Sequence, residues 1–437
     1  MELNGEQLQA VRAVINEQKS IFLTGEAGCG KSETLKHILA ATSVVDPDDP
    51  TAPIPVGVTA MTGRAAILIG GKTLHSFLGI GLGKRPVEEL VDFTRIKNKK
   101  TCQKLRLLKI LIIDEVSMLD AELLDKISLY LQRLRGNDAP FGGVQMIFCG
   151  DHFQLRSISG QYFFHALEWV RLDPTVCTLT EKFRQAGDTE FQDILSVVRK
   201  GDCPPDVLQR LKSTATNTFC IEPTKLYALN ADIDVVNELR FAQVSATAPS
   251  ILTYKRQIIV TGKTKATAPD KAALVKICES ARIPESIQLC AGVQVVVTWN
   301  IPKVDGSDEP TLVNGTRGEV VSVTPTTVLI RMVNNQLATI SYFNYVPDDM
   351  PKVEVRFMPL RLAFAMSIHS AQGMTLDCVE LDLGSSIFEF GQAYTALSRA
   401  KSLDSVCIRK IKASSFKTHP DVLEFGQHRV NRHVNMP

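Results

Sequence analysis

The stretch GEAGCGKSET, residues 25–34, decides the fold of this chain. It fits the pattern G-x-x-x-x-G-K-[S/T], follows the apolar run 21–24 (IFLT) and precedes the segment 33–41 (ETLKHILAA), which has helical spacing. Glycines in such a loop let backbone N–H groups surround phosphate oxygens, and the helix N-terminus adds a positive field. A chance glycine-rich turn is the alternative, but it requires neither the strand nor the helix. We therefore predict a phosphate-binding loop.

The side chains of this loop have separate expected roles. Lys31 would reach the β- and γ-phosphates of ATP, and Ser32 would ligate Mg²⁺. The other predicted nucleotide contacts within the stretch are Gly25, Glu26, Ala27, Gly28, Cys29, Gly30 and Glu33.

Three further apolar runs, 56–60 (VGVTA), 109–114 (KILIID) and 144–151 (VQMIFCGD), predict buried strands that alternate with helices. This order is typical of a doubly wound α/β domain with a parallel sheet, in which ligands bind at the carboxyl ends of the strands. Asp114 would hold Mg²⁺, directly or through water, and Glu115 would polarise the attacking water. An ordinary acidic pair at a strand end is the alternative, but beside a phosphate loop Mg²⁺ needs a second protein carboxylate.

Gln154 follows the run 144–151 and is the third candidate at a strand end, where it could reach the γ-phosphate or the water. Two arginines outside this domain are candidates for neutralising charge: Arg184 in LTEKFRQ and Arg399 in YTALSRA. An arginine from a second domain contributes a rate factor of about 10³–10⁵ in phosphoryl transfer. A lone arginine is otherwise most often a surface or ion-paired residue.

The length of 437 residues indicates more than one domain. We predict a first α/β domain over residues 1–175 with a small insertion at about 78–108, and a second over 176–290 and 362–437. Short β runs between them predict an inserted β domain at 291–361.

Composition and charge narrow the partners. A hydrophobic content of 44% and a charged content of 22% are typical of globular proteins. The net charge of +2 means that a nucleic-acid partner would need local basic surfaces. Ten cysteines without CxxC pairs or zinc spacing indicate reduced thiols in an intracellular protein. No membrane-spanning segment, signal peptide or Arg-rich mitochondrial presequence is apparent, and the compartment stays open.

A series of short motifs from residue 3 to about 410 resembles the petite-integration-frequency (PIF) helicases, RecD-like members of helicase superfamily 1B. The motifs are LNGEQ, GEAGCGKS, MTGRAA, TLHSF, IIDEVSML, GDHFQL, LTEKFRQ, LVNGTRG, SIHSAQGMTLD and YTALSRAK. The resemblance implies two RecA-like domains with ATP between them and an inserted SH3-like barrel. It also implies a motor that moves 5′ to 3′ on single-stranded DNA and unwinds duplexes.

The resemblance also assigns roles to residues. Gln7 matches an adenine-reading glutamine, and Gly373 matches a position near the phosphates. Lys31, Asp114, Glu115, Gln154, Arg184 and Arg399 match the ATPase residues. The expected DNA contacts, with side chains suited to phosphate oxygens or base stacking, are Arg64, Thr73, His75, Phe77, Asn230, Ser367, His369 and Ser370. Phe77 by itself is equally typical of a core residue.

We therefore expect ATP and Mg²⁺ as ligands, single-stranded and forked or tailed duplex DNA as partners, no membrane, and a monomer as the working unit. Two alternatives stay open: a translocase that strips proteins without unwinding, and a nucleotide-switched DNA-binding scaffold. The basic segment 95–100 (RIKNKK) is either part of a strand-separating wedge or a solvated loop.

Overall fold

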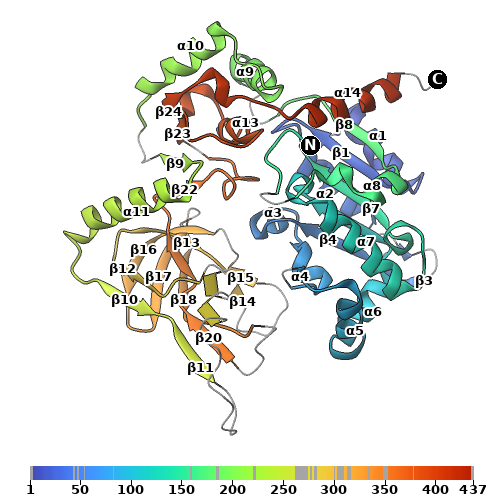
Figure 1. The fold of residues 1–437 in the computed structure, drawn as a ribbon, viewed down its shortest axis with the longest axis horizontal. Helices are drawn as coiled ribbons and strands as arrows, with labels where there is room; N and C mark the ends of the chain where they lie inside the picture. The colour runs from blue at the N-terminus through green and yellow to red at the C-terminus, as the bar shows by residue number, and fades with distance from the viewer. Residues whose placement is uncertain are drawn as a thin grey trace. The chain divides into compact units, whose positions relative to one another are not determined.

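The computed structural model divides the chain into two compact units, shown in Figure 1. Unit 1 comprises Met1–Ala228 and Ile368–Pro437, and unit 2 comprises Leu229–Ser367. The structure describes residues 3–42, 45–46, 49–53, 55–81, 83–157, 160–183, 187–219, 223–260, 274–275, 278–279, 283–299, 301–302, 310–312, 316–332, 335–347, 353–376 and 378–434.

Unit 1 is built on a six-stranded parallel sheet in the order β5-β4-β6-β7-β1-β8. Its strands are β1 (Ile21–Gly25), β4 (Val56–Ala60), β5 (Lys72–Thr73), β6 (Ile110–Asp114), β7 (Gln145–Gly150) and β8 (Thr175–Leu179). The predicted strands and the doubly wound α/β fold class are confirmed. Ala60 pairs with Asp114 and Thr24 with Gly150, so the residues after these strands share one edge of the sheet.

Helices and aromatic side chains cover the two faces of this sheet. Ile21 and Leu23 pack into one core cluster with residues of α1, α2 and α3, whereas Phe22 points to the other face, as alternation along a strand requires. There its ring meets Phe163 and Trp169 at 5.5 Å between centroids. The helices of unit 1 are α1 (Gly5–Ile15), α2 (Lys31–Thr42), α3 (Gly63–Leu68), α4 (Leu74–Leu78), α5 (Val87–Lys97), α6 (Lys99–Leu107), α7 (Ala121–Arg135), α8 (Leu167–Leu172), α9 (Thr189–Arg199), α10 (Pro205–Ser213), α13 (Gln392–Leu397) and α14 (Pro420–Val434).

A second parallel sheet in unit 1 contains β9 (Thr224–Tyr227), β23 (Val379–Leu383) and β24 (Val406–Ile411), in that order. Two of these strands correspond to the predicted runs KLYALN and VCIRK. Because β8 pairs with β1, the first sheet continues past residue 175, where we placed the first domain boundary. The assignment of residues to the individual domains stays a prediction.

Unit 2 is rich in antiparallel strands. A five-stranded sheet has the order β18-β17-β16-β13-β21, a three-stranded sheet the order β11-β20-β19, and β10 pairs with β12. Their bounds are β10 (Leu252–Lys255), β11 (Gln257–Val260), β12 (Ser286–Leu289), β13 (Gln294–Val297), β16 (Arg317–Val323), β17 (Thr327–Met332), β18 (Leu337–Ser341), β19 (Phe343–Tyr345), β20 (Val353–Phe357) and β21 (Leu360–Leu362), with the short strands β14 (Ile301–Pro302), β15 (Pro310–Leu312) and β22 (Ala365–Ser367).

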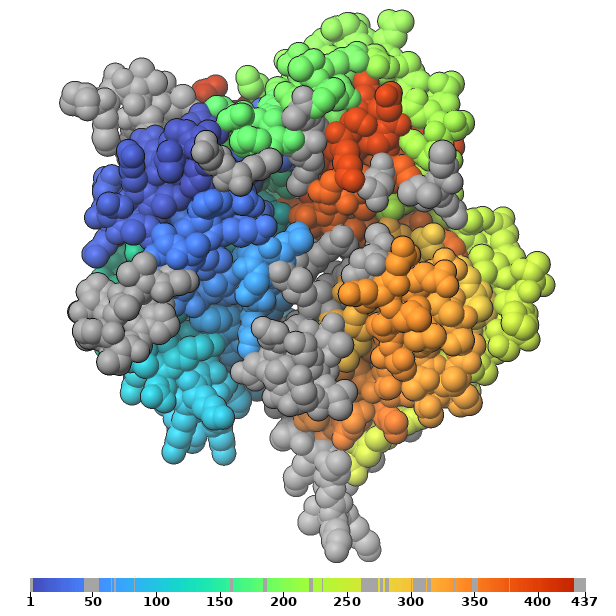
Figure 2. All heavy atoms as spheres, turned by 180° about the vertical axis from the view of Figure 1, so that it is seen from behind, coloured from blue at the N-terminus to red at the C-terminus, as the bar shows by residue number. Residues whose placement is uncertain are grey.

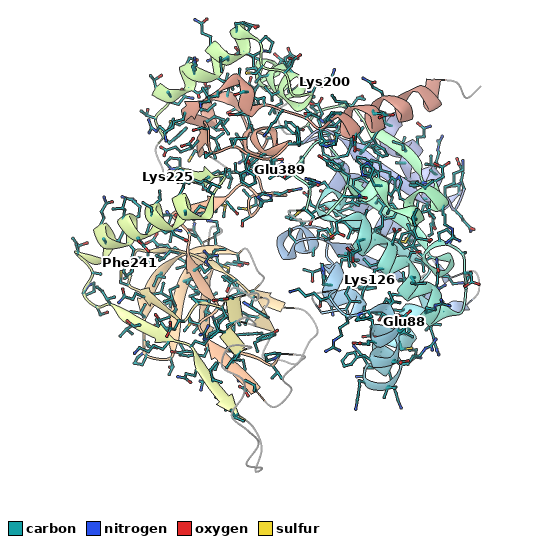
Figure 3. All side chains as sticks on the ribbon, viewed as in Figure 1. Glu88, Lys126, Lys200, Lys225, Phe241 and Glu389 are labelled. Atoms are coloured by element: carbon teal, nitrogen blue, oxygen red, sulfur yellow. The ribbon has the colours of Figure 1, made fainter. Side chains whose placement is uncertain are left out.

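Unit 2 includes more residues than the predicted inserted domain at 291–361, since it extends from Leu229 to Ser367. Its helix α11 (Asn230–Ser245) packs Phe241, labelled in Figure 3, and Val244 against the core of the five-stranded sheet. The SH3-like character of this β domain stays a prediction, and the predicted turn at 314–315 lies outside the described residues.

The segment 95–100 is helical rather than a loop. Arg95 and Lys97 lie in the last turn of α5, Asn98 separates the two helices, and α6 begins at Lys99. The predicted surface loop 42–55 carries a short antiparallel pair, β2 (Val45–Asp46) with β3 (Asp49–Pro53).

The nine cysteines within the described ranges are all free thiols. Over the same part of the chain, no group of three or more His, Cys, Asp or Glu side chains is arranged to hold a metal ion. None of the helices described is both long and apolar enough to traverse a bilayer.

Candidate nucleotide site and nucleic-acid contacts

The glycine-rich loop lies between β1 and α2, at the carboxyl edge of the first sheet. Gly25 has φ +152°, and a Cβ there would collide with the main-chain carbonyl of Leu179 on β8, so the tight exit from β1 requires glycine. Lys31 Nζ donates to the carbonyl oxygens of Gly25 and Glu26 at 2.8 Å each. Burial works against its charge, but the nearby Cys29 and Asp151 outweigh this and raise the pKa of Lys31. The lysine is therefore held charged against the loop.

Gln7 lies beside this loop. It forms a capping box with Asn4 at the start of α1, where its backbone N–H donates to the Asn4 side chain at 2.9 Å. Its side chain is 3% exposed, and a Cβ on Gly30 would lie 2.7 Å from Gln7 Nε2. The amide thus borders the loop, as its predicted role requires.

The remaining loop residues divide into two groups. Ser32 and Glu33 lie in the first turn of α2, where Glu33 faces Lys36 at 3.4 Å on an open surface. Glu26 instead meets Lys182 at 2.8 Å, and the Phe183 N–H donates to the Gly28 carbonyl at 2.9 Å. The motif LTEKFRQ therefore runs along the phosphate loop, although Arg184 itself lies outside the described residues.

Asp114 and Glu115 end β6 at the same edge. Asp114 Oδ1 accepts the backbone N–H of Glu115 at 2.9 Å. Burial, together with the neighbouring Glu115, raises the pKa of Asp114 to about 6. A divalent cation would stabilise the ionised form, so the Asp114 carboxylate and Ser32 hydroxyl are a suitable oxygen donor set for Mg²⁺. Few protein ligands suffice, because Mg²⁺ retains waters and binds substrate phosphates.

The segment after Ile368 reaches the acidic pair. Gln372 Nε2 donates to Ser117 Oγ at 2.9 Å and to Glu115 Oε2 at 3.3 Å. A Cβ on Gly373, which has φ +76°, would lie 3.1 Å from Glu115 Oε1. The predicted position near the nucleotide is therefore next to Glu115. Sequence reasoning missed Gln372, although it precedes Gly373 in the motif SIHSAQGMTLD.

Arg399 contacts Gln154, which follows the end of β7. It lies just beyond α13, is 2% exposed, and donates through Nη2 to Gln154 Oε1 at 3.3 Å. Its Nε also donates to the Thr395 carbonyl at 2.9 Å, and its Nη1 to that of Met374 at 3.2 Å. The structure thus brings Arg399 to the strand ends of the first sheet.

A buried network beside the loop was not predicted from sequence. Arg199 of α9 donates to Asp151 Oδ1 at 2.8 Å, and the Tyr394 hydroxyl donates to Asp151 Oδ2 at 2.8 Å. Ala27 N–H in turn donates to Tyr394 Oη at 3.4 Å. Burial would raise the pKa of Asp151, but Arg199 holds it well below its usual range. The available signals were the position of Asp151 at a strand end and of Tyr394 in YTALSRA.

The segment TLHSF supplies part of the predicted DNA contacts. Thr73 caps α4, its hydroxyl accepting the Ser76 N–H at 3.4 Å. His75 is half-buried, and burial lowers its pKa. Phe77 is 9% exposed and lies beneath Lys104 Nζ, 3.7 Å from its ring centroid. The structure therefore favours a core role for Phe77 over base stacking, because its ring is covered.

The other predicted DNA contacts are distributed over both units. Arg64 lies in α3 of unit 1, and His369 and Ser370 follow Ile368 in the same unit. Asn230 begins α11, and Ser367 ends β22, both in unit 2. The side chains of Arg64 and Asn230 lie outside the described part of the chain.

The phosphate-binding loop after β1, the acidic pair at the end of β6 in the same sheet and the arginine that follows α13 define a P-loop NTPase with two RecA-like domains. The sequence pattern of the PIF1-like helicases matches residues 2–207. Together with the likeness to a solved family member described next, this match means that the chain belongs to the PIF1-like helicase family.

The crystal structure of Pif1 helicase from Candida albicans is 31% identical in sequence, with a TM-score of 0.84 over 98% of this chain and 99% of that one. Pif1 helicase from Bacteroides in complex with ADP-AlF3 and single-stranded DNA is 25% identical, with a TM-score of 0.78 over 99% and 98% of the two chains. The human ATP-dependent DNA helicase PIF1 is 33% identical over 97% of this chain. The chain spans 63% of the length of that human relative.

Proposed function

We propose that this chain is an ATP-dependent DNA helicase, which moves 5′ to 3′ on single-stranded DNA and unwinds duplex or structured DNA. The observation that carries the proposal is the contact of the second α/β segment with the strand ends of the first sheet. Arg399 meets Gln154, and Gln372 meets Glu115. The state of a nucleotide at these strand ends would therefore change how the two sheets are held, which is what a motor needs.

The chain's own residues divide the chemistry among them. Ser32 and Asp114 would hold Mg²⁺, which neutralises phosphate charge when bound. Lys31 exchanges its carbonyl partners for phosphate oxygens, and Glu115 orients the attacking water and accepts its proton. Arg399, already in contact with Gln154, adds positive charge where the transition state needs it.

Hydrolysis would be coupled to movement through the DNA contacts. Loss of the γ-phosphate weakens the charge that attracts Lys31 and Arg399, so the two sheets separate by a small step. Thr73 and His75 on one segment and His369 and Ser370 on another would hold the DNA alternately. The Bacteroides relative, which binds single-stranded DNA together with ADP-AlF3, supports this assignment of substrates.

The test is Mg²⁺-dependent ATP hydrolysis with and without single-stranded DNA, run beside unwinding of duplexes that carry a 5′ or a 3′ tail. We expect DNA-stimulated hydrolysis and opening of the 5′-tailed duplex alone, and Lys31→Ala abolishes both. Sedimentation on the tailed substrate should show one copy per DNA.

Stimulated hydrolysis without strand separation would instead identify a translocase that strips proteins from DNA. If the protein is folded but single-stranded DNA does not stimulate its ATP hydrolysis, the nucleotide-switched DNA-binding scaffold becomes the favoured function.

A further inference from the structure

A cationic pocket lies away from the nucleotide site, where α5 and α6 pack on the end of α7. It has a volume of about 470 Å³, and three arginines line it: Arg95 of α5, Arg106 of α6 and Arg135 of α7. Leu134, Gly136, Asn137 and Gly142 complete its wall. Figure 1 shows the three helices side by side, and Figure 2 shows the segment of α5 and α6, in cyan, at the surface.

The three guanidinium groups are held in place by main-chain carbonyls. Arg95 Nη2 donates to the Arg133 carbonyl at 2.6 Å, and Arg106 Nε donates to the Leu134 carbonyl at 3.1 Å. Both acceptors belong to the last turn of α7, where a helix leaves its carbonyls without partners. Arg135 donates to four carbonyls, those of Leu105, Arg106, Leu108 and Gly142, at 2.7–2.9 Å.

These contacts orient the arginines without neutralising them. No carboxylate forms an ion pair with any of the three within the described residues. Each guanidinium has five N–H donors, and the contacts of Arg95 and Arg106 occupy only one donor apiece. Burial lowers the pKa of Arg135, because it disfavours the charged form of the guanidinium. Fixed cations with unused donors are a preorganised site for an oxyanion.

The surroundings favour a polymer of phosphates over a small anion. Residues 95–106 contain Arg95, Lys97, Lys99, Lys100, Lys104 and Arg106 but no acidic residue. All six are exposed on the same two helices. Repeated cations that extend along two helices beyond one pocket suit the repeated negative charge of a nucleic-acid backbone.

The pocket also lacks the aromatic side chains that channels for single-stranded nucleic acid use for base stacking. Proteins that bind single strands combine basic residues with aromatic side chains on which bases stack. No aromatic side chain lines this pocket, so it suits a strand that presents only its phosphates because its bases are paired. We propose that Arg95, Arg106 and Arg135 bind a backbone phosphate of the duplex arm of a tailed or forked DNA.

This inference rests on the proposed function, and its test separates the two. The variant combines Arg95→Gln with Arg106→Gln, which removes two charges but leaves the four contacts of Arg135. Binding to a 5′-tailed duplex and to the same single strand without its complement is measured by fluorescence anisotropy over a range of salt concentrations. We expect affinity for the tailed duplex to fall about tenfold at low salt. The slope of log K against log salt should fall by roughly 1.

Three measurements keep the result interpretable. Single-strand binding and single-strand-stimulated hydrolysis should stay within twofold of wild type, and Arg95→Lys with Arg106→Lys should restore most duplex affinity. The matched control Lys212→Gln with Lys412→Gln removes two exposed charges elsewhere in unit 1 and should leave duplex binding unchanged. Circular dichroism and thermal unfolding establish that each variant is folded.

The pocket inference is overturned if the folded Arg95/Arg106 variant binds the tailed duplex as wild type does. Equal losses for single strand and duplex would also overturn it, since the site would then not distinguish paired bases. A rise in the KM for ATP without DNA would mean that the pocket holds a free phosphate compound instead. Failure of the proposed function would give a different result, because DNA would then not stimulate ATP hydrolysis even in the wild-type protein.

Discussion

Glu115 is one of the described non-glycine residues with a left-handed backbone conformation. Its φ of 55° and ψ of 42° lie in the left-handed region, which is unfavourable for a side chain with a Cβ, by about 1–3 kcal/mol. Contacts with Gln372 and the close approach of Gly373 keep its carboxylate at the edge of the first sheet. Asp114 beside it is buried and has its pKa raised to about 6. The two carboxylates of one pair therefore have different environments and suit different roles.

Replacement of Glu115 by Gln should separate nucleotide binding from hydrolysis. The amide keeps the shape but cannot accept a proton, so we expect DNA-stimulated kcat to fall about 10²–10⁴-fold. Affinity for a fluorescent nucleotide should change by less than threefold. Glu122→Gln, an exposed change in the first turn of α7, is the control in the same steady-state assay. Retention of a tenth or more of wild-type kcat would assign proton acceptance to another group.

At the scale of elements, α14 packs onto the aromatic face of the first sheet. Phe425 stacks on Phe164 at 4.2 Å and meets the His152 ring at 5.3 Å. Gly426 also lies next to this ring, since a Cβ there would be in van der Waals contact with His152 Nε2 at 3.4 Å. His152 Nδ1 lies 3.2 Å from Thr24 Oγ1, while its Nε2 has no hydrogen-bond partner among the described residues. Burial, with Arg199 nearby, lowers the pKa of His152 to about 3.

This packing predicts a loss of stability in mild acid. Unfolded His152 takes up a proton below its ordinary pKa of about 6.5, whereas the folded protein resists protonation until about pH 3. The contribution of His152 to the free energy of unfolding is therefore complete well above pH 6.5 and declines as the pH falls. The loss is about 1.4 kcal/mol at pH 5.5. Asp151 does not make the unfolding free energy depend on pH in this range, because its pKa is lowered and it takes up a proton only in stronger acid.

The measurement is urea unfolding, followed by tryptophan fluorescence, at pH 8 and pH 5.5. In His152→Gln the difference in unfolding free energy between the two pH values should shrink by about 1.4 kcal/mol relative to wild type. His37→Gln, on the surface of α2, should leave that difference intact. An unchanged pH dependence in His152→Gln would mean that α14 admits water to the ring.

At the scale of the whole molecule, the nucleotide site is assembled from chain segments far apart in sequence. The first sheet supplies Asp151, α9 supplies Arg199, and α13 supplies Tyr394. This buried network lies beside the phosphate loop through Ala27. A charge buried on one sheet thus depends on partners from the segments around the other sheet. The network therefore connects the phosphate loop to residues of α9 and α13.

Disruption of this network should reduce stability and coupling together. Arg199→Gln leaves Asp151 buried without a cation, and we expect a loss of about 3–5 kcal/mol in unfolding free energy. The double variant Asp151→Asn with Arg199→Gln should regain part of that loss, since no unpaired charge remains. In this double variant, single-stranded DNA should stimulate ATP hydrolysis less than it does in the wild-type protein.

A double-mutant cycle from chemical unfolding measures the coupling between Asp151 and Arg199. Strict additivity, within about 0.5 kcal/mol, would show that the pair contributes no specific interaction. Full DNA stimulation in the double variant would exclude the network from communication between the sheets.

The sequence alone determined the phosphate loop, the parallel strands of the first sheet and the family resemblance, because these depend on local patterns. A strand, a glycine turn and a helix are adjacent in the chain, so GEAGCGKSET could be interpreted without knowledge of distant contacts. The strand-end position of Asp114 and Glu115 followed from the apolar run before them. The same reasoning left the basic segment 95–100 open between part of a strand-separating wedge and a solvated loop, because local patterns do not show that its helices pack on α7.

Only the tertiary structure decided which residues meet. It joined β8 to the first sheet, buried Phe77, and brought Gln372, Arg199 and Tyr394 to the strand ends. It also placed Arg135 of α7 beside Arg95 of α5 and Arg106 of α6, which precede it in the sequence by 40 and 29 positions. The physical reason is that hydrogen bonds and ion pairs between distant segments depend on packing of both partners, and no spacing rule within one segment encodes that meeting.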